Sequence, residues 1–156
     1  MSEPLKAGDK APDFDLPSDG GGQVRLADFK GSKLVLYFYP KDDTTGCTSE
    51  AKGFSDAAAD FAAAGASVVG VSKDSIKSHD KFKAKYELKL TLGSDVDGAM
   101  VERYGVWVEK SMYGRKYMGI DRSTYVIDGE GRIVKLWRKV KVPGHVEEVL
   151  AAARTA

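Results

Sequence analysis

The segment from Lys33 to Tyr39 constrains the fold of this chain most, because every side chain after the first is aliphatic or aromatic. Such an unbroken apolar run is typical of a strand buried on both faces of a sheet. Pro40 ends the run, and residues that form caps and turns follow it up to Gly46. Apolar residues then recur at helical spacing and predict a helix over about 47–64. They are Phe54, Ala57, Ala58, Phe61 and Ala62.

Strand and helix patterns continue to alternate after this helix. We expect a strand over 66–72, a helix over about 74–86 and a further helix around 96–104. The segment 105–121 contains glycines and shows no clear periodicity, so we predict an irregular loop of a length that is often functional. Near the N-terminus, the consecutive glycines at 20–22 mark a hairpin tip or a loop.

The C-terminal part predicts a hairpin followed by a helix. Two strands are expected over 123–128 and 132–137, and the glycine-containing residues 129–131 join them. Pro143 and Gly144 precede a helix with one apolar stripe. A βαβ half followed by such a hairpin and helix is the plan of the α/β thioredoxin-like fold, a central mixed β-sheet flanked by helices. The stripe consists of Val146, Val149, Leu150 and Ala153.

The composition is that of one domain spanning residues 1–156, since 42% hydrophobic residues can supply a real core. The 24 basic and 23 acidic residues create no field for nucleic acid or an anionic membrane, so we expect small molecules or proteins as partners. No apolar run has the length of a membrane span or the form of a signal peptide. A cytoplasmic location is therefore expected, and a single cysteine agrees with a reducing compartment.

The chemistry depends on Cys47, the only cysteine, which the pattern places at or near the first turn of the helix after the strand. Unpaired backbone N–H groups and the helix dipole favour an anion there, and hence the thiolate. Thioredoxins carry a C-x-x-C motif at this point of the fold. Here the corresponding residues are Thr44, Thr45, Gly46 and Cys47, so dithiol chemistry is excluded.

The spacing Pro40-x-x-x-Thr44-x-x-Cys47 resembles the active-site motif of the peroxiredoxins. Its flanking residues 38–42 and 46–50 resemble the bacterioferritin comigratory protein branch, also called peroxiredoxin Q. The resemblance covers nearly the whole chain, including residues 8–14, 122–128 and 140–150.

This resemblance implies an antioxidant oxidoreductase, a thiol-dependent peroxidase that reduces hydrogen peroxide and organic hydroperoxides. It implies Cys47 as the peroxidatic cysteine, Thr44 and Arg122 as its polar partners, and Pro40 as a shield of the site. A low-pKa thiolate is a weaker nucleophile, so a fast peroxidase also needs donors aimed at the breaking O–O bond. A hydroxyl can orient the peroxide, and a permanently charged guanidinium can favour the thiolate and the developing negative oxygen.

Two further residues are expected to support this site. Glycine at position 46 allows close approach, so backbone N–H groups near Gly46 can join the cradle. Glu50, one turn beyond Cys47, can hold Arg122 through a charge-assisted pair. Simpler explanations exist for each residue: Thr44 can cap the helix, Arg122 can be solvated, and an acid such as Glu50 is favoured in a first turn.

The product of peroxide reduction is a cysteine sulfenic acid, which must condense with another thiol. Members of the resembled branch carry a resolving cysteine at one of two places, where this chain has Lys52 and Lys83. We therefore predict a single-cysteine form that uses an external thiol, namely thioredoxin, glutaredoxin or glutathione. We expect a monomer or weak dimer without a cofactor, and no metal, because His79, His145 and Cys47 lack metal-site spacing.

Several alternatives remain open from the sequence. The chain can be a peroxide sensor or redox-regulated binding protein, in which Cys47 oxidises without turnover. It can also be a cysteine hydrolase or transferase with His145 as base, although nothing near Cys47 resembles the known thiol proteases. We expect both histidines to be surface or capping residues. The aromatic residues of the 105–121 segment either line a peroxide entrance or cover the core, and we favour the core. They are Trp107, Tyr113 and Tyr117.

Overall fold

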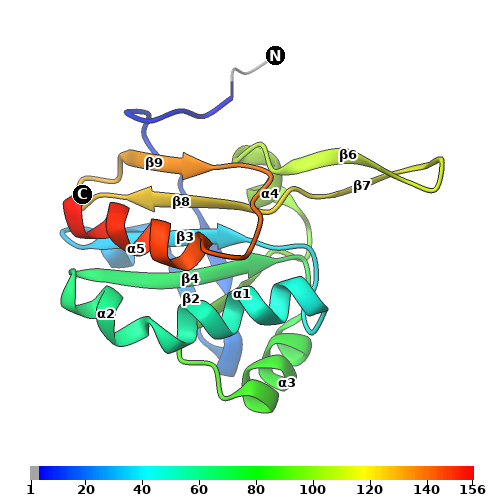
Figure 1. Cartoon of the computed structure of the whole chain (residues 1–156), viewed down its shortest axis with the longest axis horizontal. Helices are drawn as coiled ribbons and strands as arrows, with labels where there is room; N and C mark the ends of the chain where they lie inside the picture. Colours follow the sequence, from blue (N-terminus) through cyan, green and yellow to red (C-terminus); the bar gives the residue numbers. More distant parts are fainter. Residues whose placement is uncertain (1–3) are drawn as a thin grey trace.

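The computed structural model describes residues 4–156 and is organised around a five-stranded sheet with the order β5-β4-β3-β8-β9 (Figure 1). Strands β3, β4 and β5 run parallel, whereas β8 is antiparallel to both β3 and β9. The sheet is therefore mixed, as the thioredoxin-like plan requires, and this expectation is confirmed. The strands are β3 (Lys33–Phe38), β4 (Ala66–Ser72), β5 (Thr91–Ser94), β8 (Ser123–Ile127) and β9 (Ile133–Trp137).

Helices cover both faces of this sheet. The predicted helix over 47–64 is two helices, because the backbone leaves helical geometry at Ala57 (φ −92°, ψ 4°). Phe54 and Phe61 lie on opposite sides of this break, both are fully buried, and their ring centroids are 5.8 Å apart. The helices are α1 (Thr45–Asp56), α2 (Ala58–Ala63), α3 (Ile76–Tyr86), α4 (Ala99–Arg103) and α5 (His145–Thr155).

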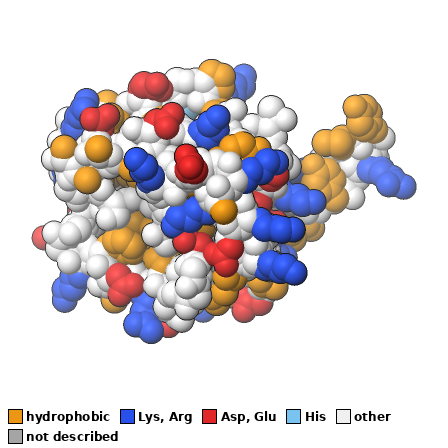
Figure 2. Space-filling model, turned by 90° about the horizontal axis from the view of Figure 1, so that it is seen from below, with side chains coloured by type: hydrophobic (Ala, Val, Ile, Leu, Met, Phe, Trp, Pro, Cys, Tyr) orange, Lys and Arg blue, Asp and Glu red, His pale blue; other side chains and the backbone are white. Residues whose placement is uncertain are grey.

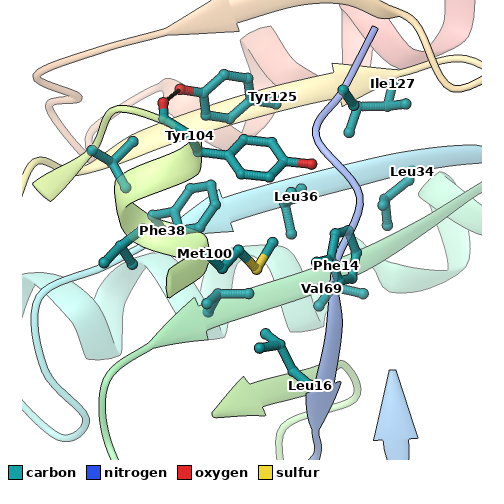
Figure 3. Packing of buried hydrophobic residues seen from close by; sticks show 14 of the residues in the cluster. Phe14, Leu16, Leu34, Leu36, Phe38, Val69, Met100, Tyr104, Tyr125 and Ile127 are labelled. Atoms are coloured by element: carbon teal, nitrogen blue, oxygen red, sulfur yellow. Dashed lines mark hydrogen bonds between the residues drawn. The ribbon is translucent and has the colours of Figure 1, made fainter. Parts of the chain in front are cut away.

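The central strand β3 separates two apolar cores, and its side chains alternate between them. Leu36 and Phe38 point into the core that α4 covers, where Phe38 packs against Tyr104 and Tyr125 (Figure 3). Tyr37 points into the other core, which α1, α2, α3 and α5 cover and which also contains Cys47. Burial on both faces explains why this strand is apolar without interruption.

The prediction of an irregular loop over 105–121 is wrong. The segment forms a hairpin of β6 (Trp107–Met112) and β7 (Arg115–Ile120), which projects from the body of the molecule (Figures 1 and 2). Tyr113 (φ 52°) and Gly114 (φ 79°) form the two-residue turn, with the positive φ angles typical of a tight hairpin. Most of its side chains are solvent-exposed, so the strands lack the apolar alternation by which a strand is recognised.

The aromatic residues of this hairpin divide between two environments. Trp107 packs against the core, as expected, and the ammonium of Lys73 lies 4.2 Å from its ring centroid. Tyr113 is 99% exposed and Tyr117 is 44% exposed, so the prediction that they cover the core is wrong. On the projecting hairpin, Figure 2 shows hydrophobic side chains together with basic ones.

The N-terminal glycines form a hairpin tip, as one of the two predictions stated. Strands β1 (Asp15–Pro17) and β2 (Gln23–Arg25) pair in antiparallel fashion around the 3-10 turn Asp19–Gly21. A second 3-10 turn, Leu26–Phe29, leads into β3. Within residues 4–156, the structure contains no helix with both the length and the apolar character needed to cross a membrane.

Gly70 in β4 gives a test of the packing beside the site. It is the register partner of Tyr37 in the parallel β3–β4 pair, and an added Cβ would lie 2.7 Å from Cζ of that tyrosine. The ring cannot move aside, because it is fully buried and stacks on Phe54 with centroids 4.7 Å apart. We expect Gly70→Ala to lower the free energy of unfolding by about 1–3 kcal/mol, measured by urea denaturation.

The matched control is Ser67→Ala, which lies in the same strand but is exposed. It should change the free energy of unfolding by less than about 0.5 kcal/mol. Wild-type stability of Gly70→Ala would contradict the close packing described for Tyr37.

Candidate active site

Cys47 lies in the first turn of α1, at the carboxyl end of β3, as the sequence predicts. Its side chain is 1% exposed and belongs to the core cluster that contains Tyr37 and Tyr39. The backbone N–H of Thr48 donates to the carbonyl of Thr44 at 2.8 Å, so this turn is formed and its first N–H groups have no intrahelical acceptor. The thiol is thus buried at the positive end of a helix.

Arg122 is the residue that the tertiary structure brings to Cys47. It directly precedes β8, whose Ser123 pairs with Phe38 at the end of β3, so the sheet register fixes its position. Its Nη2 donates to Sγ of Cys47 at 3.3 Å, and its Nη1 donates to Oε1 of Glu50 at 2.7 Å. One guanidinium therefore contacts both the thiol and the carboxyl group.

Gly46 makes this approach possible. A Cβ at that position would lie 3.1 Å from Nη2 of Arg122, tighter than an ordinary contact. The guanidinium is largely shielded, with 17% of the side chain exposed. Burial works against its charge, but the electrostatic interactions and hydrogen bonds with Glu50 and Cys47 outweigh this effect and raise the pKa of Arg122. The explanation of Arg122 as an ordinary solvated residue does not fit this geometry.

Glu50 is fully buried, and burial raises the pKa of its carboxyl group to about 7 even though Arg122 acts in the opposite direction. The two oxygens of this carboxyl differ. Oε1 accepts the bond from Arg122, whereas Oε2 is buried and has no hydrogen-bond partner. A carboxylate with one unpartnered oxygen is costly in a core, which is consistent with proton uptake near neutral pH.

Thr44 and Pro40 lie on the exposed side of the site. Thr44 occupies the N-cap position of α1, but its side chain makes no capping hydrogen bond, and its Oγ1 donates to the carbonyl of Lys41 at 2.9 Å. Capping therefore does not explain this threonine. Both residues come just before Cys47 in the loop that leaves β3, and no hydrogen bond joins either side chain to Sγ among the described residues.

The expectation that His79 and His145 are surface or capping residues is wrong, since they are 0% and 4% exposed and the N-caps of their helices are Ser75 and Gly144. His145 begins α5, and its Nε2 lies 2.8 Å from Oγ1 of Thr124, so this ring is engaged away from Cys47. Burial lowers its pKa. The proposed Cys–His pair of a hydrolase is therefore not formed.

No cluster of histidine, cysteine and acidic side chains suited to a metal ion occurs within residues 4–156. The buried polar group around His79 was missed from the sequence. His79 precedes the buried Phe82 by one helical turn, and this spacing is the signal that places both on one face of α3.

Comparison with known proteins agrees with the fold and the position of the thiol. The model of the AhpC/TSA family matches residues 7–136. Peroxiredoxin Bcp of Bacillus subtilis is 50% identical over 94% of this chain and 93% of its own length. Peroxiredoxin Bcp of Escherichia coli is 44% identical, with 94% of each chain covered.

Solved structures show the same relationship. A structure of Xanthomonas campestris peroxiredoxin Q superposes with a TM-score of 0.87, at 47% identity, over 91% of this chain and 90% of the other. A Xylella fastidiosa PrxQ mutant gives a TM-score of 0.93, at 40% identity, over 99% and 98%. A further structure was studied for the alkyl peroxide reduction activity of the Xanthomonas campestris bacterioferritin comigratory protein, with a TM-score of 0.87, 46% identity and 91% and 90% coverage.

The raised pKa of Glu50 predicts a distinctive dependence of stability on pH. An acid whose pKa rises from 4.5 to about 7 on folding holds its proton more tightly in the folded state. The free energy of unfolding should therefore fall as pH rises through this window, by about 3 kcal/mol from this group. We expect Glu50→Gln to remove that contribution, measured by urea denaturation at several pH values.

Glu102→Gln, an exposed position in α4, is the matched control and should keep the wild-type pH dependence. If Glu50→Gln and the wild-type protein lost stability equally over this window, the carboxyl group would be ionised throughout.

Proposed function

Because the chain belongs to the AhpC/TSA family and is a thiol-dependent peroxidase of the peroxiredoxin Q type, we propose that Cys47 is the thiol that attacks the peroxide. The observation that carries this proposal is the 3.3 Å contact between Nη2 of Arg122 and Sγ of the only cysteine. We propose hydrogen peroxide and organic hydroperoxides as substrates, as expected from the sequence. A cation beside a thiol suits their reduction.

The reaction transfers one oxygen atom. The thiolate of Cys47 donates an electron pair to the terminal oxygen of the peroxide, so an S–O bond forms as the O–O bond breaks. The peroxide is reduced, and its other oxygen leaves as an alkoxide or hydroxide that takes up a proton to become alcohol or water. The sulfur is oxidised to a sulfenic acid.

Arg122 assists this step in two ways. Its positive charge favours the thiolate. Its N–H groups can donate hydrogen bonds to the leaving oxygen and so stabilise the negative charge that develops there as the O–O bond breaks. Glu50 holds the guanidinium by its 2.7 Å bond, and Gly46 leaves room for it. Because the guanidinium is held before the substrate arrives, no reorganisation is needed at the moment of reaction.

Thr44 and Pro40 act on the open side of the site. The Oγ1 hydroxyl of Thr44 donates its proton to the carbonyl of Lys41, so its lone pairs can accept the proton of the peroxide and orient it toward sulfur. The ring of Pro40 carries no N–H group and shields the approach from water.

The second half of the cycle needs an external thiol, because the chain has one cysteine. The two lysines at the resolving positions also have ordinary roles. Lys52 is exposed on α1, and Nζ of Lys83 forms a 2.7 Å ion pair with Asp19. We propose that thioredoxin, glutaredoxin or glutathione attacks the sulfenic acid and releases water, and that a second thiol then frees Cys47.

We propose that the chain works as one domain, as a monomer or weak dimer. A reducing compartment such as the cytoplasm supplies the thiols that its cycle needs.

A steady-state assay tests the proposed function directly. We expect the wild-type protein to consume hydrogen peroxide and an alkyl hydroperoxide catalytically with a thioredoxin system, a glutaredoxin system or glutathione, run in parallel. Cys47→Ser should lose this activity entirely, because no other residue of the chain can form a sulfenic acid. Oxidation of Cys47 in a one-to-one ratio without turnover by any of these reductants would instead establish a peroxide sensor.

The role of Arg122 is tested by Arg122→Lys, which keeps the charge but loses the two-sided contact with sulfur and carboxylate. We expect the second-order rate constant for oxidation of Cys47 by hydrogen peroxide to fall by about 100-fold, measured by stopped-flow fluorescence. The matched control is Arg132→Lys, which replaces an exposed arginine whose Nη1 donates to the carbonyl of Gly8. This variant should react at the wild-type rate. A wild-type rate in Arg122→Lys would show that charge alone is sufficient.

A further inference from the structure

A buried polar cluster connects the active-site loop, residues 40–46, with α3 and β5, and the peroxide chemistry makes no use of it. At its centre is His79 in α3, which is completely buried. One ring nitrogen, Nδ1, lies 2.7 Å from Oδ2 of Asp42 in the loop. The other, Nε2, lies 2.9 Å from the carbonyl oxygen of Gly93 in β5. The ring therefore bridges two segments that flank the site.

The partners of His79 determine its charge. A backbone carbonyl can only accept a hydrogen bond, and an ionised carboxylate can only accept one. Both ring nitrogens must then donate, which requires the imidazolium form. Burial, the largest influence, lowers the pKa of His79, but the contacts with Asp42, Gly93 and Asp74 outweigh it and raise the pKa above its usual value.

Other charged and titratable groups surround the pair. The hydroxyl of Tyr39, the residue that follows β3, lies 3.4 Å from Nδ1, and Asp74 follows β4. From α3, Lys81 and Lys85 line the pocket above Asp42. Asp43 lines the same pocket, and its Oδ2 accepts a 2.8 Å bond from Nζ of Lys85, so the charge of that lysine is paired with Asp43.

Asp42 is the point where this cluster holds the loop. Its Oδ1 accepts a bond from the hydroxyl of Tyr39 at 2.5 Å, and its Oδ2 accepts one from Oγ of Ser78 at 2.8 Å. Its backbone N–H donates to Oδ2 of Asp74 at 2.8 Å. Side chains of the residue after β3, of α3 and of the segment after β4 thus converge on one loop residue, which is 7% exposed.

The loop must move during catalysis if an external thiol completes the cycle. Cys47 is 1% exposed, so an incoming thiolate cannot reach the sulfur in line with the S–O bond while the first turn of α1 stays packed. Asp42 lies five residues before Cys47, on the segment that has to separate from α3. Separation would leave a buried imidazolium without its carboxylate, which is strongly unfavourable.

We propose that His79 is a positioning residue that holds the active-site loop against α3 and β5 as an imidazolium, and so sets how often Cys47 becomes accessible to an attacking thiol. The structural part of this proposal stands alone, and only the thiol step rests on the proposed function. His79 does not contact sulfur or peroxide and acts through Asp42.

The charge of His79 makes opening of the loop depend on pH. A histidine whose pKa is raised on folding contributes its full stabilisation below the unfolded value of 6.5, and this contribution is lost as pH rises through the folded value. The closed loop should therefore be most stable in mild acid and should open more often in alkaline solution.

Hydrogen exchange measured by NMR tests this directly in the full chain. The reporters are the amides of Asp42 and Thr48, which donate to Asp74 and Thr44, and the references are the β8 amides of residues 125–127. In His79→Asn we expect protection of the reporters to fall about tenfold at mildly acidic pH, with unchanged references. Wild-type protection of the reporters relative to the β8 references, corrected for intrinsic exchange, should decline above pH 6.5, whereas the variant should show no such relative decline.

The matched control is His145→Asn, which replaces the other buried histidine. In His145→Asn, any loss of protection should affect the reporter and reference amides alike. The decline in reporter protection above pH 6.5 should persist in this variant. Equal protection of the loop in wild type and His79→Asn, or the same pH dependence in both, would overturn the proposal. Should His79→Asn not fold, Asp42→Asn carries the same expectation. In the wild-type protein, NMR must also show protons on both ring nitrogens of His79 in mild acid.

The thiol step is measured separately by stopped-flow mixing of oxidised protein with glutathione. Reduction of the sulfenic acid should be about tenfold faster in His79→Asn, in proportion to the loss of protection, while oxidation by peroxide should not accelerate. An unchanged reduction rate with altered protection would refute the link to thiol access. Failure of glutathione, thioredoxin and glutaredoxin to reduce any form of the protein would count against the proposed function and leave the exchange result intact.

Discussion

The antiparallel pairing of β8 with β3 is the constraint on which the site depends. Phe38, at the end of β3, is opposite Ser123, so Arg122 arrives beside the helix that β3 leads into. The chain separation between Arg122 and Cys47 is 75 residues, yet the sheet register leaves little freedom in their relative position. A shift of one residue would turn Arg122 to the other face of the sheet and remove the guanidinium from the thiol.

Near Arg122 there are more groups that can carry a negative charge than there are positive charges. One guanidinium faces two groups that can be negative, Sγ of Cys47 and Oε1 of Glu50. Burial opposes a second negative charge, and the carboxyl group accordingly has its pKa near neutrality. Two buried contacts between an acidic and a basic side chain thus lie near Cys47: Glu50 with Arg122, and Asp42 with His79.

Much of the fold could be predicted because its signals are local. The β3 and β4 strands are largely buried and rich in apolar residues, and the predicted range 66–72 coincides with β4. The β6–β7 hairpin could not be recognised, since its exposed side chains show no alternation. His79 and His145 were misplaced because a single histidine carries no local sign of its partners, which lie at distances of 37 and 21 residues along the chain.

The sequence by itself determined that one thiol stands at the start of a helix and that any resolving thiol must come from outside, since both follow from residue identity and spacing. Only the tertiary structure decided that Arg122 touches Sγ, that Glu50 is buried with one oxygen unpartnered, and that His79 holds Asp42. Side-chain direction repeats with the period of the helix or strand, so neighbouring residues in the sequence are enough to indicate local structure. Contacts between residues distant in the sequence depend on the strand order and register of the sheet. Burial then influences which of the buried groups are charged.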